Sequence, residues 1–366
     1  MHKLLDILKS SQIRTLGLPA ITILLLILLA AGYVISCSDN AKDPLDQRVR
    51  VSLTRPTQPS QLTSLFGPVH YGHEFGLDFR KEDFLIFQSH AIATQSVLAN
   101  QTAILGGSLV AHLLLRERGQ DFKIFCSQTN LDDFVAVGRN GVTKLEQFFD
   151  PNVRVGIDSA GGAGEIILNA MFQAAGIKKR LADIPHTRLI ESSGLRTSVF
   201  VANDVDATVI HLTQFNQAAR EIPDAAIISA LFEDVPIFLK EVFAARTSWL
   251  EENQELAAAF CASVIKASRE LPKDFDLFVQ GVNEFVGEPP NEDLLREIFD
   301  LLGQYDFWPI NGGLAPEAIT MMAELAVDGG TLKEVPNPEV VVDRRPLKRA
   351  LELLGGRVDH SRKLEK

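Results

Sequence analysis

A run of small residues, Ser159–Gly164, is the part of the sequence best suited to hold a ligand. It follows an alternating apolar segment that starts at Val153 and precedes apolar residues at helical spacing from Ile166, which predicts a strand, a tight turn and a helix. The first N–H groups of a helix lack partners within the helix, and the helix dipole favours negative charge there. Small side chains leave these groups accessible, so the turn is predicted to seat an anion or a polar group.

This turn lacks the sequences that bind nucleotides. It has no Gly-Lys-Ser/Thr ending of a P-loop, and no G-x-G-x-x-G reads across it. The alternative is a tight strand-to-helix turn with nothing bound. The residues predicted here to donate backbone or hydroxyl hydrogen bonds are Ser159, Gly161, Gly162 and Ala163.

Polar or small residues also follow the other predicted strands. Ligands of open α/β sheets bind beyond the carboxyl ends of the strands, so these loops are predicted to face the ligand. Arg55 could pair with a carboxylate or sulfonate, or point to solvent, and His211 either contacts the ligand or packs within the fold. The ligand-binding residues predicted on these loops are Thr54, Arg55, Gln58, Ser89, Gly107, Ser108, Asn130 and His211.

Metal and catalytic sites are not indicated. His70, His73 and Glu74 lie close in sequence, but there is no H-E-x-x-H pattern, and no further ligand is evident in a distant part of the sequence. No Ser-His-Asp or Cys-His set is supported by spacing. We therefore predict no metal, no cofactor and no catalytic residue.

The three cysteines are Cys37, Cys126 and Cys261, and their spacing fits neither a zinc site nor a redox pair. Cys126 lies in an apolar strand pattern and Cys261 in an apolar helix pattern. The simplest interpretation is two buried thiols. A single disulfide between them stays open as an alternative.

The composition excludes some partners. The chain has 366 residues, 46% of them hydrophobic, and a net charge of −11. This length suffices for two domains with sizeable cores. A strongly acidic chain lacks the basic face that nucleic acid requires, so no nucleic-acid partner is expected.

The N-terminal segment has the features of a targeting signal and a membrane anchor. Residues 16–35 are almost wholly apolar and follow basic residues, as in a secretory signal or a membrane helix. The sequence Val-Ile-Ser-Cys ending at Cys37 resembles the bacterial lipoprotein box, which implies cleavage before Cys37 and lipid on its sulfur. An uncleaved anchor is the alternative. Residues 1–36 are thus predicted to be the signal or anchor segment and 37–48 a polar tether that holds the protein at an extracytoplasmic membrane surface.

The rest of the chain predicts two α/β lobes. Strands alternate with helices in two series, and a mainly helical stretch follows, so each lobe is expected to be a mainly parallel sheet flanked by helices. The predicted first lobe is 49–138 plus 245–366, and the second is 139–244. Two crossing strands, near 134–138 and 236–246, are expected to hinge them.

Several passages in this order resemble one family. They are ATQSVLANQ at 93–101 with the following TAILGG, NDVDATV at 203–209, the passage from Gly141 to Phe149 with VRVGIDSAGGAG after it, and the segment Trp249–Ala267. Over roughly residues 49–330 the chain resembles the nitrate/sulfonate/taurine type of ABC-transporter solute receptors, which includes binders of thiamine pyrimidine precursors. The resemblance implies a periplasmic-binding-protein-like type II fold whose two lobes close on a solute. The cysteine-rich motif of the pyrimidine synthases that share this fold is missing here.

The resemblance implies a non-enzymatic function. We expect an extracytoplasmic solute-binding lipoprotein of an ABC importer that captures a small polar or anionic organic solute. Its partners would be that solute, the permease and ATPase subunits, and the membrane, reached through lipid on Cys37 or an N-terminal helix. The alternatives are an enzyme of the same fold acting on a small heterocycle and a membrane-attached sensory module.

Overall fold

The computed structural model describes residues 48–54, 58–87, 89–158, 163–190, 192–235, 238–286, 291–305 and 307–359. Residues 49–366 form one compact unit, distinct from residues 1–48. The predicted signal segment, Cys37 and the tether up to residue 47 lie outside the described residues. Within the described ranges, no helix combines the length and the apolar character needed to cross a membrane.

The first sheet has five strands in the order β2-β1-β3-β10-β4. Strand β1 pairs in parallel with both β2 and β3, and β10 pairs antiparallel with both β3 and β4. Four strands therefore run in one direction and β10 in the other. The strands are β1 (Val51–Thr54), β2 (Phe84–Phe87), β3 (Ile104–Ser108), β4 (Phe122–Thr129) and β10 (Glu241–Arg246).

The second sheet repeats this arrangement in the order β7-β6-β8-β5-β9. Strand β6 pairs in parallel with β7 and β8, and β5 pairs antiparallel with β8 and β9. Here β5 is the reversed strand. The strands are β5 (Phe134–Gly138), β6 (Val155–Ile157), β7 (Thr187–Leu189), β8 (Ala207–His211) and β9 (Ala226–Ala230).

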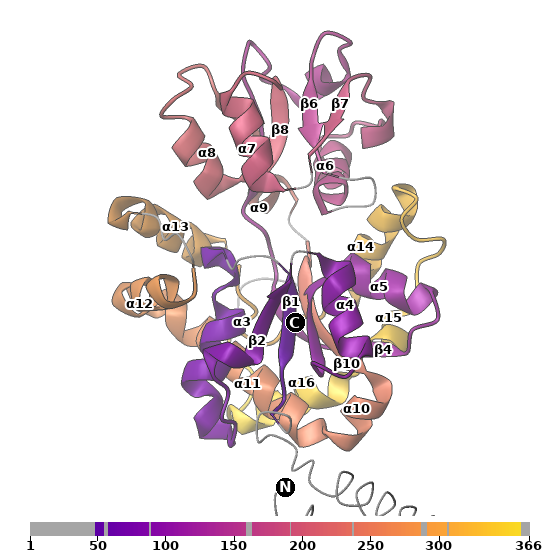
Figure 1. Ribbon diagram of the computed structural model, residues 1–366, viewed down its shortest axis with the longest axis vertical. Coiled ribbons are helices and arrows are strands. Elements are labelled where there is room, and N and C mark those ends of the chain that lie inside the picture. Colours follow the sequence, from indigo (N-terminus) through magenta and orange to yellow (C-terminus); the bar gives the residue numbers. More distant parts are fainter. Residues whose placement is uncertain are drawn as a thin grey trace, which may run out of the picture. The chain divides into compact units, whose positions relative to one another are not determined.

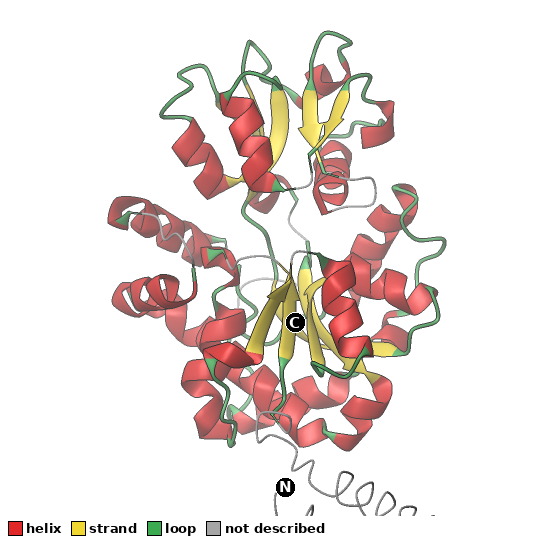
Figure 2. Ribbon diagram, viewed as in Figure 1, coloured by secondary structure: helices red, strands yellow, loops and turns green. Residues whose placement is uncertain are grey.

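Two mainly parallel sheets, each flanked by helices, confirm the predicted fold class (Figure 2). The reversed strand of each sheet directly follows a passage of the chain from the other sheet. The chain leaves the first sheet after β4 to form β5, and it returns after β9 to form β10. By strand pairing, 134–138 belongs to the second sheet and 241–246 to the first, while the lobe boundaries stay a prediction.

The helices flank the sheets and fill the C-terminal third of the chain (Figure 1). Several begin at a side chain that accepts a hydrogen bond from an amide of the first turn, as Ser89, Ser192, Asp274 and Asn291 do. The helices are α3 (Thr63–Phe66), α4 (His90–Leu98), α5 (Leu109–Glu117), α6 (Ala163–Ala174), α7 (Ser193–Val201), α8 (Leu212–Ala218), α9 (Leu231–Asp234), α10 (Thr247–Glu252), α11 (Gln254–Glu270), α12 (Phe275–Phe285), α13 (Glu292–Gln304), α14 (Pro316–Asp328), α15 (Pro338–Val341) and α16 (Arg344–Leu353).

A disulfide joins the first sheet to its longest helix. Cys126 in β4 and Cys261 in α11 are both fully buried and bonded, with their Cα atoms 5.7 Å apart. The interpretation of two thiols is therefore wrong, although both residues are buried as predicted. The open alternative of a single disulfide is the one that the structure shows.

The motif at 203–209 has a structural explanation. The carboxylate of Asp206, just before β8, accepts hydrogen bonds from the Arg154 backbone N–H at 2.9 Å and from its Nε and Nη2 at 2.9 and 2.7 Å. Asn140 Nδ2 donates to the same carboxylate at 2.8 Å. These bonds fasten the start of β6 and the turn after β5 to β8.

We expect Asp206→Asn to lower the free energy of unfolding by about 1–2 kcal/mol, because Arg154 is half exposed and water weakens the pair. The hydrogen bonds from Arg154 lower the pKa of Asp206 to about 2. Its stabilisation is thus present above pH 3.8 and is lost as the pH falls toward 2. Urea unfolding at several pH values measures this, with exposed Asp204→Asn as the control; equal losses in both variants would contradict the assignment.

Candidate functional site

The helix after the predicted ligand turn, α6, is capped by a carboxylate of the protein itself. Asp158 accepts hydrogen bonds from the backbone N–H groups of Gly164 at 2.8 Å and Glu165 at 3.2 Å. A Cβ atom at residue 164 would lie 2.7 Å from Asp158 Oδ1, which explains the glycine there. These two amides are therefore occupied, and a negative charge already lies at the positive end of the helix dipole.

The predicted contact residues of this turn are only partly described. Ser159, Gly161 and Gly162 lie outside the described residues. Ala163 is the first residue of α6 and is half-buried. A ligand at the turn has to use amides that precede Gly164, so the four contacts stay predictions.

The loops after β2 and β3 lie at one edge of the first sheet, because the two strands run in the same direction. Ser89 is exposed and caps α4, while Gly107 and Ser108 end β3 just before α5. The first amide of α5, at Leu109, donates to the carbonyl oxygen of Lys240 at 2.7 Å. The structure thus places these three predicted residues at the expected edge, and it ties α5 to the segment that enters β10.

Other predicted residues of the first lobe have structural roles or lie outside the described residues. Asn130, which follows β4, is buried, and its N–H donates to the carbonyl oxygen of Phe307 at 2.8 Å. The backbone N–H of Gln58 donates to a side chain three residues further along. Thr54 ends β1, and its side chain and Arg55 lie outside the described residues. None of these contacts tests the predicted roles in ligand binding.

His211, the last residue of β8, belongs to a buried group of five charged or titratable side chains. We call Asp132, Asp133, His211, Lys240 and Glu241 the crossing cluster. Asp132 and Asp133 lie between β4 and β5, whereas Lys240 precedes β10 and Glu241 begins it. His211 Nδ1 lies 2.6 Å from Asp133 Oδ1. Lys240 Nζ contacts Asp132 Oδ2 and lies 3.5 Å from Glu241 Oε1.

Burial and mutual attraction set the charges of the crossing cluster. Burial raises the pKa of Asp132 to about 7 despite the attraction of Lys240 and His211. Burial acts in the same sense on Asp133, but the charge and hydrogen bond of His211 bring its pKa down to about 2. Burial opposes the charge of Lys240, yet the neighbouring carboxylates raise its pKa. Asp133 and Lys240 are therefore ionised at neutral pH.

Side chains of the first lobe hold this cluster in place. Gln61 Nε2 donates to both carboxylate oxygens of Glu241 at 2.7 and 2.8 Å. Ser60 Oγ donates to Asp133 Oδ1 at 3.5 Å, and the carbonyl oxygen of Ser60 accepts from Trp308 Nε1 at 2.8 Å. Trp308 is buried in the core, and this bond gives its indole N–H the partner that burial requires.

Three members of the cluster have the donor atoms of a metal site. One ligand atom each from Asp132, Asp133 and His211 lies within 4.8 Å of the others. The ammonium of Lys240 contacts Asp132 and already supplies a positive charge to this carboxylate. We therefore assign no metal to the cluster. In the motif of His70, His73 and Glu74, His70 Nε2 lies 2.8 Å from Glu284 Oε2.

The sequence predicts His211 as a site residue but none of the other four members of the crossing cluster. Two acidic residues stand just before one predicted crossing strand, near 134–138, and a Lys-Glu pair lies within the other, near 236–246. Both pairs lie where the chain passes between the sheets. Consecutive charges beside buried crossing strands are therefore the signal that could have found them.

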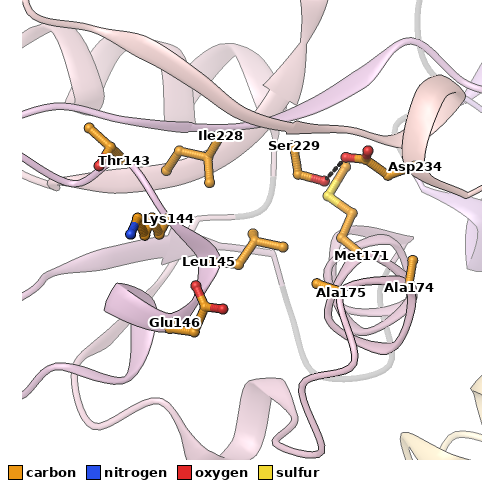
Figure 3. Close-up of a pocket in the computed structure, with 10 residues that line it drawn as sticks. All are labelled: Thr143, Lys144, Leu145, Glu146, Met171, Ala174, Ala175, Ile228, Ser229 and Asp234. Carbon is orange, nitrogen blue, oxygen red and sulfur yellow. Dashed lines mark hydrogen bonds between the residues drawn. The ribbon is translucent and has the colours of Figure 1, made fainter.

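A cavity of about 310 Å³ lies within the second lobe (Figure 3). Ser229 Oγ donates a hydrogen bond to Asp234 Oδ2 at 2.5 Å, which Figure 3 draws as a dashed line beside Met171. The cavity adjoins the C-terminal half of α6, roughly 12 Å along the helix from its first turn at the usual rise per residue. It contains none of the predicted ligand residues. Its lining is Thr143, Lys144, Leu145, Glu146, Met171, Ala174, Ala175, Ile228, Ser229 and Asp234.

Comparison with known protein families gives a match over the middle of the chain. The family described as NMT1/THI5-like matches residues 85–274, more than half of the chain. The chain therefore belongs to the NMT1/THI5-like family. None of the curated proteins matches the sequence significantly.

Three solved structures of similar fold have low sequence identity to this chain. The ligand-binding component of an ABC-type import system from Staphylococcus aureus, with zinc bound, has 12% identity and a TM-score of 0.63, and the match covers 82% of this chain and 98% of that one. The nitrate-binding protein NrtA from Synechocystis has 12% identity and a TM-score of 0.63, with 84% and 88% covered. The sulfonate-binding protein SsuA from Methylobacillus flagellatus has 12% identity and a TM-score of 0.63, with 84% and 94% covered. These matches show that the chain has the periplasmic-binding-protein fold.

Proposed function

We propose that this protein is the solute-binding receptor of an ABC importer and captures a small polar or anionic organic solute between its lobes. The observation that carries the proposal is the double crossing of the chain between two equivalent sheets. Two short crossings allow the lobes to close on a solute by hinge motion. The similar structures support the same function, since by their names one belongs to an ABC-type import system, one binds sulfonate and one binds nitrate.

The proposed location is the extracytoplasmic face of a bacterial membrane, with attachment through lipid on Cys37 or an N-terminal helix. The disulfide between Cys126 and Cys261 supports this location, because structural disulfides persist in oxidising compartments. Metabolic labelling with a fatty acid separates the two anchors. Lipid incorporation that disappears in Cys37→Ser supports lipidation, and an unlabelled wild type supports the helix.

Ligand screening of the full chain in detergent tests the receptor function. Nitrate, sulfonates, carboxylates and pyrimidines are added singly, and the thermal midpoint is recorded. A ligand at about 100 times its dissociation constant stabilises the native state by about 2.7 kcal/mol and raises the midpoint. A stabilised complex without turnover supports the receptor, and chemical conversion of the ligand supports an enzyme instead.

Gly162→Phe tests the predicted seat before α6, since a bulky side chain there would cover the amides that are predicted to bind the solute. We expect the variant to lose the ligand-induced shift. The matched control is Gly303→Phe, because a side chain at residue 303 would meet open space. Unchanged affinity in Gly162→Phe would remove this turn from the site.

A further inference from the structure

A buried ion pair joins the two crossings of the chain. Asp132 lies on the first crossing, between β4 and β5, and Lys240 lies on the second, just before β10. Lys240 Nζ contacts Asp132 Oδ2, and it also lies 4.8 Å from the centre of the Phe134 ring, at the start of β5. One ammonium group therefore holds the second crossing to the first, at the place where a hinge between the lobes has to bend.

The same ammonium has a second carboxylate within reach on its own crossing. Lys240 Nζ lies 3.5 Å from Glu241 Oε1, and Gln61 Nε2 holds that carboxylate in place by two hydrogen bonds. If Asp132 lost its charge, Glu241 would be the nearest remaining carboxylate to Lys240 among the described residues. A link within the second crossing would then replace the link between the crossings, so the cluster has the two arrangements that a switch requires.

Asp132 is the carboxylate of the crossing cluster that accepts the fewest hydrogen bonds within the described part of the chain. Its Oδ1 accepts one, from the Asp133 backbone N–H at 2.9 Å. Asp133 and Glu241 each accept two, and all of these come from side chains. Hydrogen bonds to a carboxylate favour its charged form, and burial opposes it. Asp132 is therefore the member of the cluster best placed to take up a proton.

The charges around Asp132 also favour uptake of a proton. The groups that act on it are Lys240 and Glu241 from the second crossing, Asp133 from the first and His211 from β8. Three carboxylates and one ammonium leave an excess of negative charge in a buried place, whichever charge His211 carries, and a proton on one carboxylate reduces that excess. The pKa of Asp132, raised by burial to about 7, places this change near neutral pH.

We propose that Asp132 and Lys240 form a pH-sensitive link across the hinge. With Asp132 ionised, the two crossings are held together as the structure shows. With Asp132 protonated, Lys240 turns to Glu241, the crossings separate and the lobes sample a wider range of relative orientations. This inference goes beyond the proposed receptor function, because the link acts on the hinge whether or not a solute is present.

Distances between the lobes in the full chain, in detergent and without solute, test the proposal. Spin labels are placed on Arg118→Cys in the first lobe and Lys178→Cys in the second, both at exposed residues, in a Cys37→Ala background. About 10% of the Asp132 side chains should be protonated at pH 8 and about 90% at pH 6, so the distance distribution should broaden between these values with a midpoint near pH 7. Asp132→Asn should show the broad distribution at both pH values, and exposed Asp300→Asn, the matched control, should behave as the parent protein.

Infrared spectroscopy shows whether Asp132 itself changes its charge. The wild type should gain the C=O band of a buried carboxyl group between pH 8 and pH 6, and Asp132→Asn should lack this gain. A wild type without the band, or with the band and an unchanged distance distribution, overturns the proposal. So does a broadening between pH 8 and pH 6 that persists in Asp132→Asn, since another group would then be responsible.

The test does not depend on the variant folding or on a known solute. If Asp132→Asn fails to fold, the band and the distances of the wild type still have to share one midpoint, and separate midpoints overturn the proposal. A ligand screen without a hit would remove the receptor function and leave the link between the crossings untouched.

Discussion

Removal of the disulfide is expected to lower the free energy of unfolding by about 2–5 kcal/mol. Cys126 and Cys261 are separated by 135 residues, and the chain-entropy account gives about 5 kcal/mol for a closed loop of this length. Both sulfur atoms lie in the core, so Cys126→Ala/Cys261→Ala is the suitable variant because alanine buries no new polar group. Urea unfolding monitored by circular dichroism measures the loss.

Reduction provides an independent check of the same bond. A reducing agent should shift the unfolding midpoint of the wild type toward that of the double variant and leave the variant itself unchanged. Cys37→Ala is the matched control, because it removes the third cysteine and should retain the full midpoint. If the wild type and the double variant unfolded at the same urea concentration, the disulfide would contribute nothing to stability.

The fold was largely predictable because its signals are local. Apolar segments of strand length alternate with segments of helical spacing, and the parallel sheets follow from that alternation. The pairing of Cys126 with Cys261 was not predictable, since it depends on how α11 packs against β4. The membership of residues 134–138 and 241–246 in opposite sheets likewise depends on pairing between distant strands.

Of the crossing cluster, only His211 was predictable from the sequence. It ends an apolar run at the edge of the sheet where ligands of open α/β proteins bind. Its partners Asp133 and Lys240 come from two different crossings, and no local pattern brings them together. The cap on α6 was not predicted, although its signal is local. Asp158 precedes the small-residue turn, and a short acidic side chain before a helix often accepts hydrogen bonds from the first amides of that helix.

His90 is the clearest case of a buried polar group that the fold leaves without a partner. Among the described residues, neither of its ring nitrogens has a hydrogen-bond partner, and both are enclosed. Its ring lies edge-on to that of His112, with 5.1 Å between the centroids. Burial, and then the charge of His112, lowers the pKa of His90 to about 3. The imidazole is therefore neutral in the native protein over most of the acid range.

We expect His90→Phe to raise the free energy of unfolding by about 1–2 kcal/mol at neutral pH, because it removes a desolvated polar group and keeps the aromatic contact. The gain should grow in acid. The unfolded chain binds a proton at the ordinary pKa of 6.5, whereas the native protein does so only near 3. The wild type thus loses about 1.4 kcal/mol per pH unit between these values, or about 3 kcal/mol by pH 4.5, and the variant is spared this loss.

Urea unfolding of both proteins at a series of pH values between about 4 and 8 measures the two effects. His73→Phe, at an exposed histidine, is the matched control and should leave the slope of stability against pH unchanged. His112 is retained in both proteins, so its own lowered pKa cancels from the comparison. A His90→Phe variant that is less stable at neutral pH and retains the wild-type slope would show that His90 has a partner in solution. A larger difference between the two proteins in the slope of stability against pH means that the native fold excludes the proton from this ring more completely.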